Sequence, residues 1–80
     1  MNYKEHVDKF STQEQQEIVR CVNVITEQQK NGKVEGMELA LLFDYWNRTF
    51  PTISQKMNCK ACRKTVVKFF GLLADDITNG

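Results

Sequence analysis

The four residues Ser11-Thr12-Gln13-Glu14 constrain the fold more than any other short stretch of this chain. They match a capping box, in which the serine hydroxyl accepts the backbone N–H three residues later and the glutamate accepts the serine's own N–H. Asn31-Gly32 can close the helix that begins there, because one of them can adopt the left-handed conformation. The β-branched residues between positions 18 and 26 leave a strand as the alternative. The caps favour a helix over about residues 11–29.

Three further segments carry helical patterns. A short first helix over about residues 3–10 follows from Asn2 and Glu5, which have the spacing of an N-cap and its N3 partner. Residues 34–47 are apolar nearly all round, and Pro51 ends that helix because a residue before proline avoids the α conformation. Asn58 is the expected N-cap of a last helix over about residues 59–74, with Asp75 and Asp76 in a frayed tail.

The sequence predicts an all-α fold, a small three-helix domain with a short additional N-terminal helix. With 80 residues, the chain is long enough for one domain, residues 1–80, and one small core. In two of the helices the apolar residues recur on one face. These are Ile18, Cys21, Val22 and Ile25 in the second helix, and Cys62, Val66, Phe69, Phe70 and Leu73 in the last. No stretch is apolar enough to cross a bilayer and no secretory signal is recognisable, so we expect an intracellular protein that is not secreted and has no membrane partner.

Charge is divided unevenly along the chain. Residues 1–47 hold five Lys or Arg and eight Asp or Glu, whereas residues 48–74 hold six basic residues and no acid. A helix face that carries several cations can bind phosphates and release counterions. The alternative is an ordinary solvated face, and about eleven residues separate the last two helices, too many for a helix-turn-helix reader. The candidate nucleic-acid or phosphate site is Arg48, Lys56, Lys60, Arg63, Lys64 and Lys68.

An aromatic group lies just before Pro51. Phe43, Trp46 and Phe50 recur at i, i+3 and i+7, so most of them are expected in the core. The chain nevertheless has more apolar residues than one small core can hide, and leftover aromatic and Met surface is what protein interfaces use. Phe43, Tyr45, Trp46 and Phe50 are therefore the candidate partner-binding residues.

The Cys59-x-x-Cys62 pair permits three interpretations. A zinc site would need Cys21 and His6 as well, and neither stands at a zinc-finger spacing. A redox centre at a helix start would have a lowered thiol pKa, but the βαβ setting typical of thioredoxin-like pairs is missing. The favoured interpretation is structural: Cys59 caps the last helix and Cys62 packs, and with three cysteines and no secretory signal we expect reduced thiols. We expect no metal and no cofactor.

No catalytic motif can be recognised. His6 has no Ser or Cys partner at a familiar spacing, and we expect it to be a solvated surface histidine. The sequence contains no nucleophile elbow, Gly-rich phosphate loop, calcium loop or paired carboxylates. We therefore expect a protein that is not an enzyme.

Two short submotifs resemble a known group of proteins. Leu42-Phe43-x-x-Trp46-Asn47-x-x-Phe50, followed by Asn58-Cys59-x-x-Cys62-Arg63, is similar to a pattern in small helical proteins encoded by bacteriophages, notably phages of the Bacteroidetes. Trp46 stands where those proteins usually have Tyr. The resemblance covers about residues 41–68 and implies a phage or mobile-element origin. It implies no agreed activity, so no functional residue is transferred.

These observations favour a non-catalytic, phage-encoded protein that binds another protein. The partner would be a virion component or a host factor, met in the host cytoplasm or in the virion, and a homo-oligomer is also compatible with the sequence. The first alternative is a nucleic-acid-binding regulator or virion accessory protein that uses the basic last helix. The second is a zinc or redox protein that uses the Cys-x-x-Cys pair.

Overall fold

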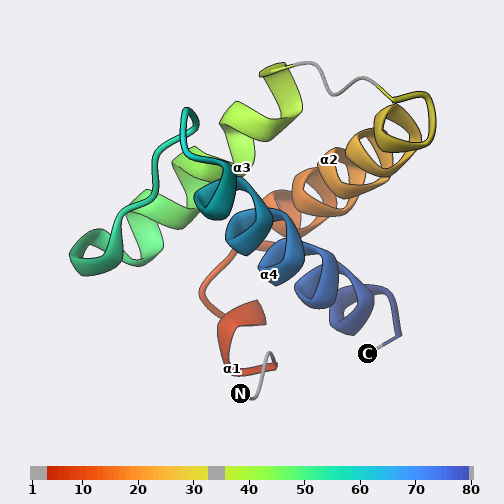
Figure 1. Ribbon diagram of the computed structural model, residues 1–80. Helices are drawn as coiled ribbons and strands as arrows, with labels where there is room; N and C mark the ends of the chain where they lie inside the picture. Colours follow the sequence, from red (N-terminus) through yellow and green to blue (C-terminus); the bar gives the residue numbers. More distant parts are fainter. Residues whose placement is uncertain (1–3, 33–35, 80) are drawn as a thin grey trace.

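The computed structural model describes residues 4–32 and 36–79 (Figure 1). Its helices are α1 (Lys4–Val7), α2 (Thr12–Lys30), α3 (Gly36–Thr49) and α4 (Lys60–Asn79), with a short 3₁₀ helix, η1 (Pro51–Ile53), after α3. The described residues contain no strand. The predicted fold class is confirmed: the protein is a small all-α domain of three main helices, with the short α1 before them.

The two predicted ends of α2 are confirmed. The backbone N–H of Glu14 donates to Ser11 Oγ at 3.1 Å, and the backbone N–H of Ser11 donates to Glu14 Oε1 at 2.9 Å. The Ser11 N–H lowers the pKa of the Glu14 carboxyl, because it stabilises the charged form. At the other end Gly32 adopts a positive φ of 76°, and its N–H donates to the carbonyl of Gln29. Helix therefore prevails over strand at positions 18–26, as the caps predicted.

The first helix is shorter than predicted. It ends at Val7, and a turn then places Phe10 in the core. The side chain of Gln15 in α2 fixes this turn, because its amide donates to the carbonyl oxygens of Val7 and Phe10 at 3.1 and 2.9 Å. The predicted cap at Asn2 lies outside the described residues.

The third helix ends two residues later than predicted, at Thr49, and Pro51 opens η1. Its predicted start at residue 34 lies outside the described residues. Pro51 stands at the first position of η1, where its missing N–H costs no hydrogen bond.

The last helix differs from the prediction at both ends. It begins at Lys60, so Cys59 rather than Asn58 occupies the capping position. It continues to Asn79, and Asp75 and Asp76 lie inside it instead of in a frayed tail. The helix extends because its apolar stripe does: Ala74 is buried and Ile77 packs against the core, one and two turns beyond Phe70.

One core joins the four α-helices. α4 contacts α1, α2 and α3, and in Figure 1 it lies in front of the other two long helices and crosses them. Both predicted apolar stripes face inward, with Val22 and Cys62 only half-buried at the edge. The buried hydrophobic residues are Phe10, Ile18, Cys21, Ile25, Leu39, Leu42, Phe43, Trp46, Val66, Phe69, Phe70, Leu73 and Ala74.

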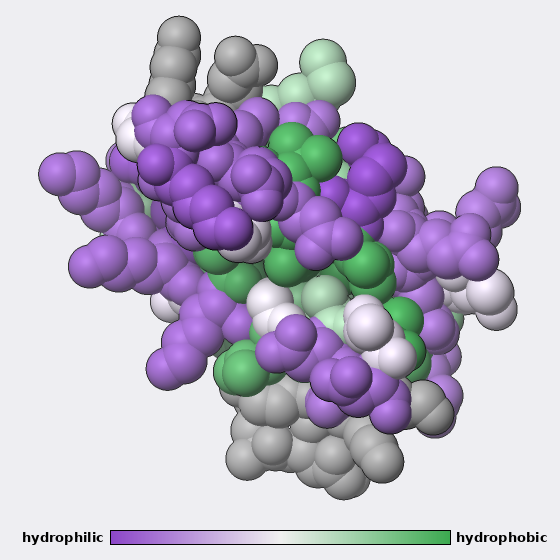
Figure 2. Space-filling model, turned by 90° about the vertical axis from the view of Figure 1, so that its right-hand side faces the viewer, coloured by the Kyte–Doolittle hydropathy of each residue, from purple (hydrophilic) through white to green (hydrophobic). Residues whose placement is uncertain are grey.

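This core does not hide all the apolar residues. Figure 2 shows the side of the molecule on which α2 and α4 end, where hydrophobic side chains gather in the middle of the face between hydrophilic ones. Four large hydrophobic side chains are exposed among the described residues: Met37, Ile53, Met57 and Leu72. None of the helices in the described ranges combines the length and apolar character needed to cross a membrane.

Two residues on α4 give a matched test of this core. Phe70 is fully buried, whereas Leu72 is 38% exposed. Phe70→Ala should lower the free energy of unfolding by about 3–5 kcal/mol, because it removes a buried ring and leaves a cavity. Leu72→Ala should cost less than about 1 kcal/mol. Urea titration followed by the fluorescence of Trp46, the only tryptophan, measures both, and equal losses would contradict this arrangement of α4.

Candidate functional site

The four aromatic residues predicted to bind a partner lie in or against the core. Phe43 and Trp46 are only 3% and 6% exposed, and Tyr45 and Phe50 are half-buried. The Trp46 ring contacts Phe50 and Phe69 at centroid distances of 4.7 and 5.1 Å. Such contacts stabilise the packing of α3 on α4. The prediction that most of Phe43, Trp46 and Phe50 belong to the core is confirmed, and the buried rings of Phe43 and Trp46 are not available at the surface.

Trp46 and Asn47 also hold the segment that follows α3. The indole Nε1–H of Trp46 donates to the carbonyl of Ile53 at 2.9 Å. The side-chain amide of Asn47 donates to the carbonyl of Gln55 at 3.1 Å, and its Oδ1 accepts the Gln55 N–H at 2.8 Å. The Trp-Asn-x-x-Phe submotif therefore has a structural role here, because it ties η1 and the residues after it back onto α3.

His6 is not the solvated surface residue that the sequence suggested. Its ring meets Phe50 and Phe69 edge-on, each at 5.4 Å between centroids. It is half-buried at the edge of the core, where α1 packs on α4. Sequence reasoning missed this because the contact of His6 with these rings depends on the packing of α1 on α4.

The cysteines follow the structural interpretation. The backbone N–H of Cys62 donates to Cys59 Sγ at 3.3 Å, so Cys59 caps α4, and Cys62 packs against the core. Cys21 is buried in α2. The four candidate zinc ligands, Cys59, Cys62, Cys21 and His6, are not brought together, since no three described His, Cys, Asp or Glu residues gather as a metal site.

The six candidate basic residues divide into two groups. Arg48 lies away from the rest, because its guanidinium contacts Glu14 in α2 at 3.4 Å and Asp44 in α3 at 3.5 Å. Its planar group also lies over the Tyr45 ring, 4.9 Å from the centroid. Arg48 is thus part of the surface where α2 meets α3, while Lys56 is exposed in the connection before α4.

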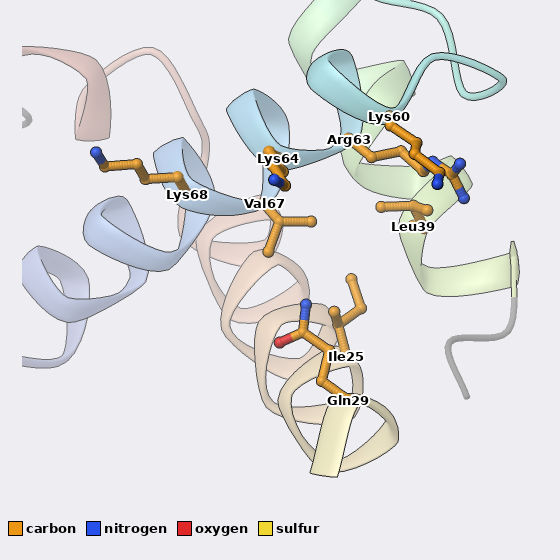
Figure 3. Close-up of a pocket in the computed structure, with 8 residues that line it drawn as sticks. All are labelled: Ile25, Gln29, Leu39, Lys60, Arg63, Lys64, Val67 and Lys68. Atoms are coloured by element: carbon orange, nitrogen blue, oxygen red, sulfur yellow. The ribbon is translucent and has the colours of Figure 1, made fainter. Parts of the chain in front are cut away.

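The other four basic residues line a groove. Lys60, Arg63, Lys64 and Lys68 border a hollow of about 640 Å³ together with Ile25 and Gln29 of α2, Leu39 of α3 and Val67 of α4. Figure 3 shows Lys60 and Arg63 extending towards Leu39, and Val67 pointing towards Ile25 and Gln29. Lys68 extends in the opposite direction, at the other end of the groove. We call this hollow the α2/α3/α4 groove.

The groove has an apolar floor and a cationic rim. Its floor consists of Ile25, Leu39 and Val67, one residue from each of the three main helices. The four rim cations are exposed, and no carboxylate of the described residues lies within ion-pair distance of them. A hollow of this size lies within the range of ligand sites, about 300–1,000 Å³. The arrangement can bind a ligand that carries both an apolar surface and negative charge.

Sequence reasoning found the rim of the groove but missed its floor. Lys60, Arg63, Lys64 and Lys68 were expected on a cationic face of the last helix, and all four are exposed. Val67 was the available signal, because it is an apolar residue inside this basic run. Ile25 and Leu39 gave none, since they belong to apolar stripes that also build the core.

Comparison with known proteins returns no matching family model, no matching curated protein and no matching solved structure. The resemblance of residues 41–68 to phage-encoded proteins stays a prediction. A proposed function therefore rests on the groove and on the charges around it.

Two asparagines test the structural role of the submotif. Asn47→Ala should lower the free energy of unfolding by about 1–2 kcal/mol, because both hydrogen bonds to Gln55 are lost. Asn58→Ala is the matched control, since Asn58 is exposed and does not occupy the capping position of α4. Urea titration measures both variants. A cost for Asn58→Ala as large as that for Asn47→Ala would mean that Asn58 caps the helix after all.

The thiols should differ in reactivity. Hydrogen bonds from the side chain and backbone N–H of Cys62 lower the pKa of the Cys59 thiol, whereas burial raises the pKa of Cys21. Iodoacetamide should therefore modify Cys59 in the folded protein well before Cys21, and the Cys59 reaction should persist to lower pH than that of an ordinary thiol. Mass spectrometry of digested samples measures the order, with Cys59→Ser as the control. Equal rates for Cys21 and Cys59 would contradict it.

Proposed function

We propose that this protein acts by binding another protein in the α2/α3/α4 groove, without catalysing a reaction. The observation that carries this proposal is the position of the α4 cations. They do not form an isolated solvated face, because they border an apolar floor built by three helices. Protein-binding surfaces combine an apolar centre with a polar rim in this way.

The groove replaces the aromatic set as the proposed contact surface. Of that set, only Tyr45 and Phe50 are partly accessible, and basic side chains lie over both rings: Arg48 over Tyr45 and Lys9 over Phe50. The partner is expected among virion or host proteins, because the resemblance of residues 41–68 to phage-encoded proteins implies a phage or mobile-element origin.

A second candidate function is nucleic-acid binding. It is favoured by the five exposed basic residues between positions 56 and 68, none of which has a described carboxylate within ion-pair distance. They are Lys56, Lys60, Arg63, Lys64 and Lys68. Cations that no acid neutralises can contact phosphates directly.

Capture experiments with matched variants test the first proposal. The immobilised protein should retain a specific protein from an extract of host cells, and Val67→Gln should lose it because a polar amide then enters the apolar floor. Leu72→Gln is the control, since Leu72 is an exposed apolar residue on the same helix that does not line the groove. Mass spectrometry compares the retained proteins. Identical sets for both variants would contradict binding through the groove.

Labelled DNA tests the second candidate. Nucleic-acid binding predicts micromolar affinity that falls steeply with salt, measured by fluorescence anisotropy on single- and double-stranded probes. Lys60→Glu/Lys64→Glu should then abolish the binding, while thermal melting shows that the variant is still folded. Under the protein-binding proposal we expect at most weak DNA binding that Val67→Gln leaves unaltered, because that variant changes no charge.

A further inference from the structure

We infer that the occupant of the α2/α3/α4 groove is an amphipathic helix of a partner protein whose flanks carry Asp or Glu. This inference rests on the proposed function and names the kind of segment that the groove receives. It follows from the spacing of the rim cations, from the chemistry of the floor and from the way in which charge is paired over the rest of the molecule.

Three of the four rim cations stand four residues apart on α4, about one helical turn from each other. Lys60, Lys64 and Lys68 stand at i, i+4 and i+8 of α4, so their Cα atoms form a row about 12 Å long. A small anion with a single charged group would meet only one or two of them. Carboxylates placed every four residues on a helix that lies along α4 repeat at the same distance and can meet each lysine in turn. The spacing therefore favours a helical occupant over a small amphiphile.

The floor is aliphatic. Ile25, Leu39 and Val67 are its apolar residues, and no aromatic side chain is among the described residues that line the groove. Proteins that bind single-stranded nucleic acids stack the bases on aromatic rings, which this floor lacks. Aliphatic side chains of an amphipathic helix, spaced three and four residues apart, bury well against such a surface. The floor thus favours a peptide over a nucleic acid.

The pairing of charge elsewhere indicates that the acidic groups come from another protein. Every described carboxylate on α2 and α3 already has a cation within 4.0 Å, whereas no described carboxylate lies that close to the rim cations of α4. These pairs are Glu14 and Asp44 with Arg48, Glu17 and Glu38 with Arg20, and Glu27 with Lys30. A second copy of this chain would have to break such pairs to present an acidic helix from α2 or α3. The other described aspartates, Asp8, Asp75 and Asp76, do not stand four residues apart on one helix and cannot match the row of lysines. A separate partner has no such cost.

A designed peptide tests the inference directly. The probe is a fluorescein-labelled peptide of about five helical turns, with Leu along one face and Glu at flanking positions four residues apart. Two control peptides accompany it: one of the same composition in scrambled order, and one with Lys in place of Glu. We expect the acidic amphipathic peptide to bind with micromolar affinity in fluorescence anisotropy, and both controls to bind at least tenfold more weakly.

Four variants of the full chain locate the binding. Lys64→Glu and Val67→Gln should each weaken the acidic peptide at least tenfold, because they change the rim and the floor of the groove. Lys56→Glu and Leu72→Gln are the matched controls, since both residues are exposed and neither lines the groove. These controls should stay within twofold of the unaltered protein. Thermal melting of all four shows that each variant is folded before its affinity is compared.

Each contrary result identifies what is wrong. If the scrambled acidic peptide binds equally well, the groove recognises negative charge alone and the helical occupant is overturned. If the acidic peptide fails to bind while capture from extract still depends on Val67, only the occupant is wrong and the proposed function stands. If DNA displaces the peptide, and Lys56→Glu lowers the affinity for DNA as much as Lys64→Glu does, nucleic acid is the ligand and both proposals fail. Self-association that Val67→Gln abolishes, seen by analytical ultracentrifugation, would assign the groove to a second copy of this chain.

Discussion

The burial of one face of α4 is the constraint on which the rest of the structure depends. α4 contacts α1, α2 and α3, and its buried residues provide the shared surface on which those helices pack. Phe69 illustrates this, because its ring contacts His6 from α1, Trp46 from α3 and Phe50 from the segment after α3. In a chain of 80 residues, whose core is small, one helix that contacts the other three α-helices determines where each of them lies. It also determines where the groove opens, since the unburied side of α4 forms one wall of it.

The sequence predicted those parts of the fold that depend on local chemistry. The ends of α2 follow from the capping box at Ser11 and from Gly32, whose hydrogen bonds join residues close in the chain. The end of α4 could not be placed in the same way, because Ile77 extends the helix through tertiary contacts with the core. The position of His6 could not be predicted either, since only the packing of α1 on α4 brings its ring to the aromatic cluster.

The candidate site was also predictable only where it depends on local sequence. The basic residues of α4 share a helix face, and a sequence period of 3.6 residues reveals that directly. The groove needs in addition that Ile25, Leu39 and Val67 meet from three helices, and no period within one segment encodes such a meeting. The aromatic residues are the converse case. Trp46 and Asn47 belong to the submotif that resembles the pattern in phage-encoded proteins. Their hydrogen bonds nevertheless show a structural role, because they hold the chain in place around η1.

The row of cations on α4 has a consequence for the free protein. Like charges four residues apart on a helix repel each other, and each such pair weakens the helix by about 0.2–0.5 kcal/mol. The Lys60–Lys64 and Lys64–Lys68 pairs both have this relation, and no described carboxylate offsets them. The repulsion among these three lysines of α4 thus opposes folding of the free protein. An anion bound along α4 would remove that repulsion, so occupancy of the groove and the stability of the fold would rise together.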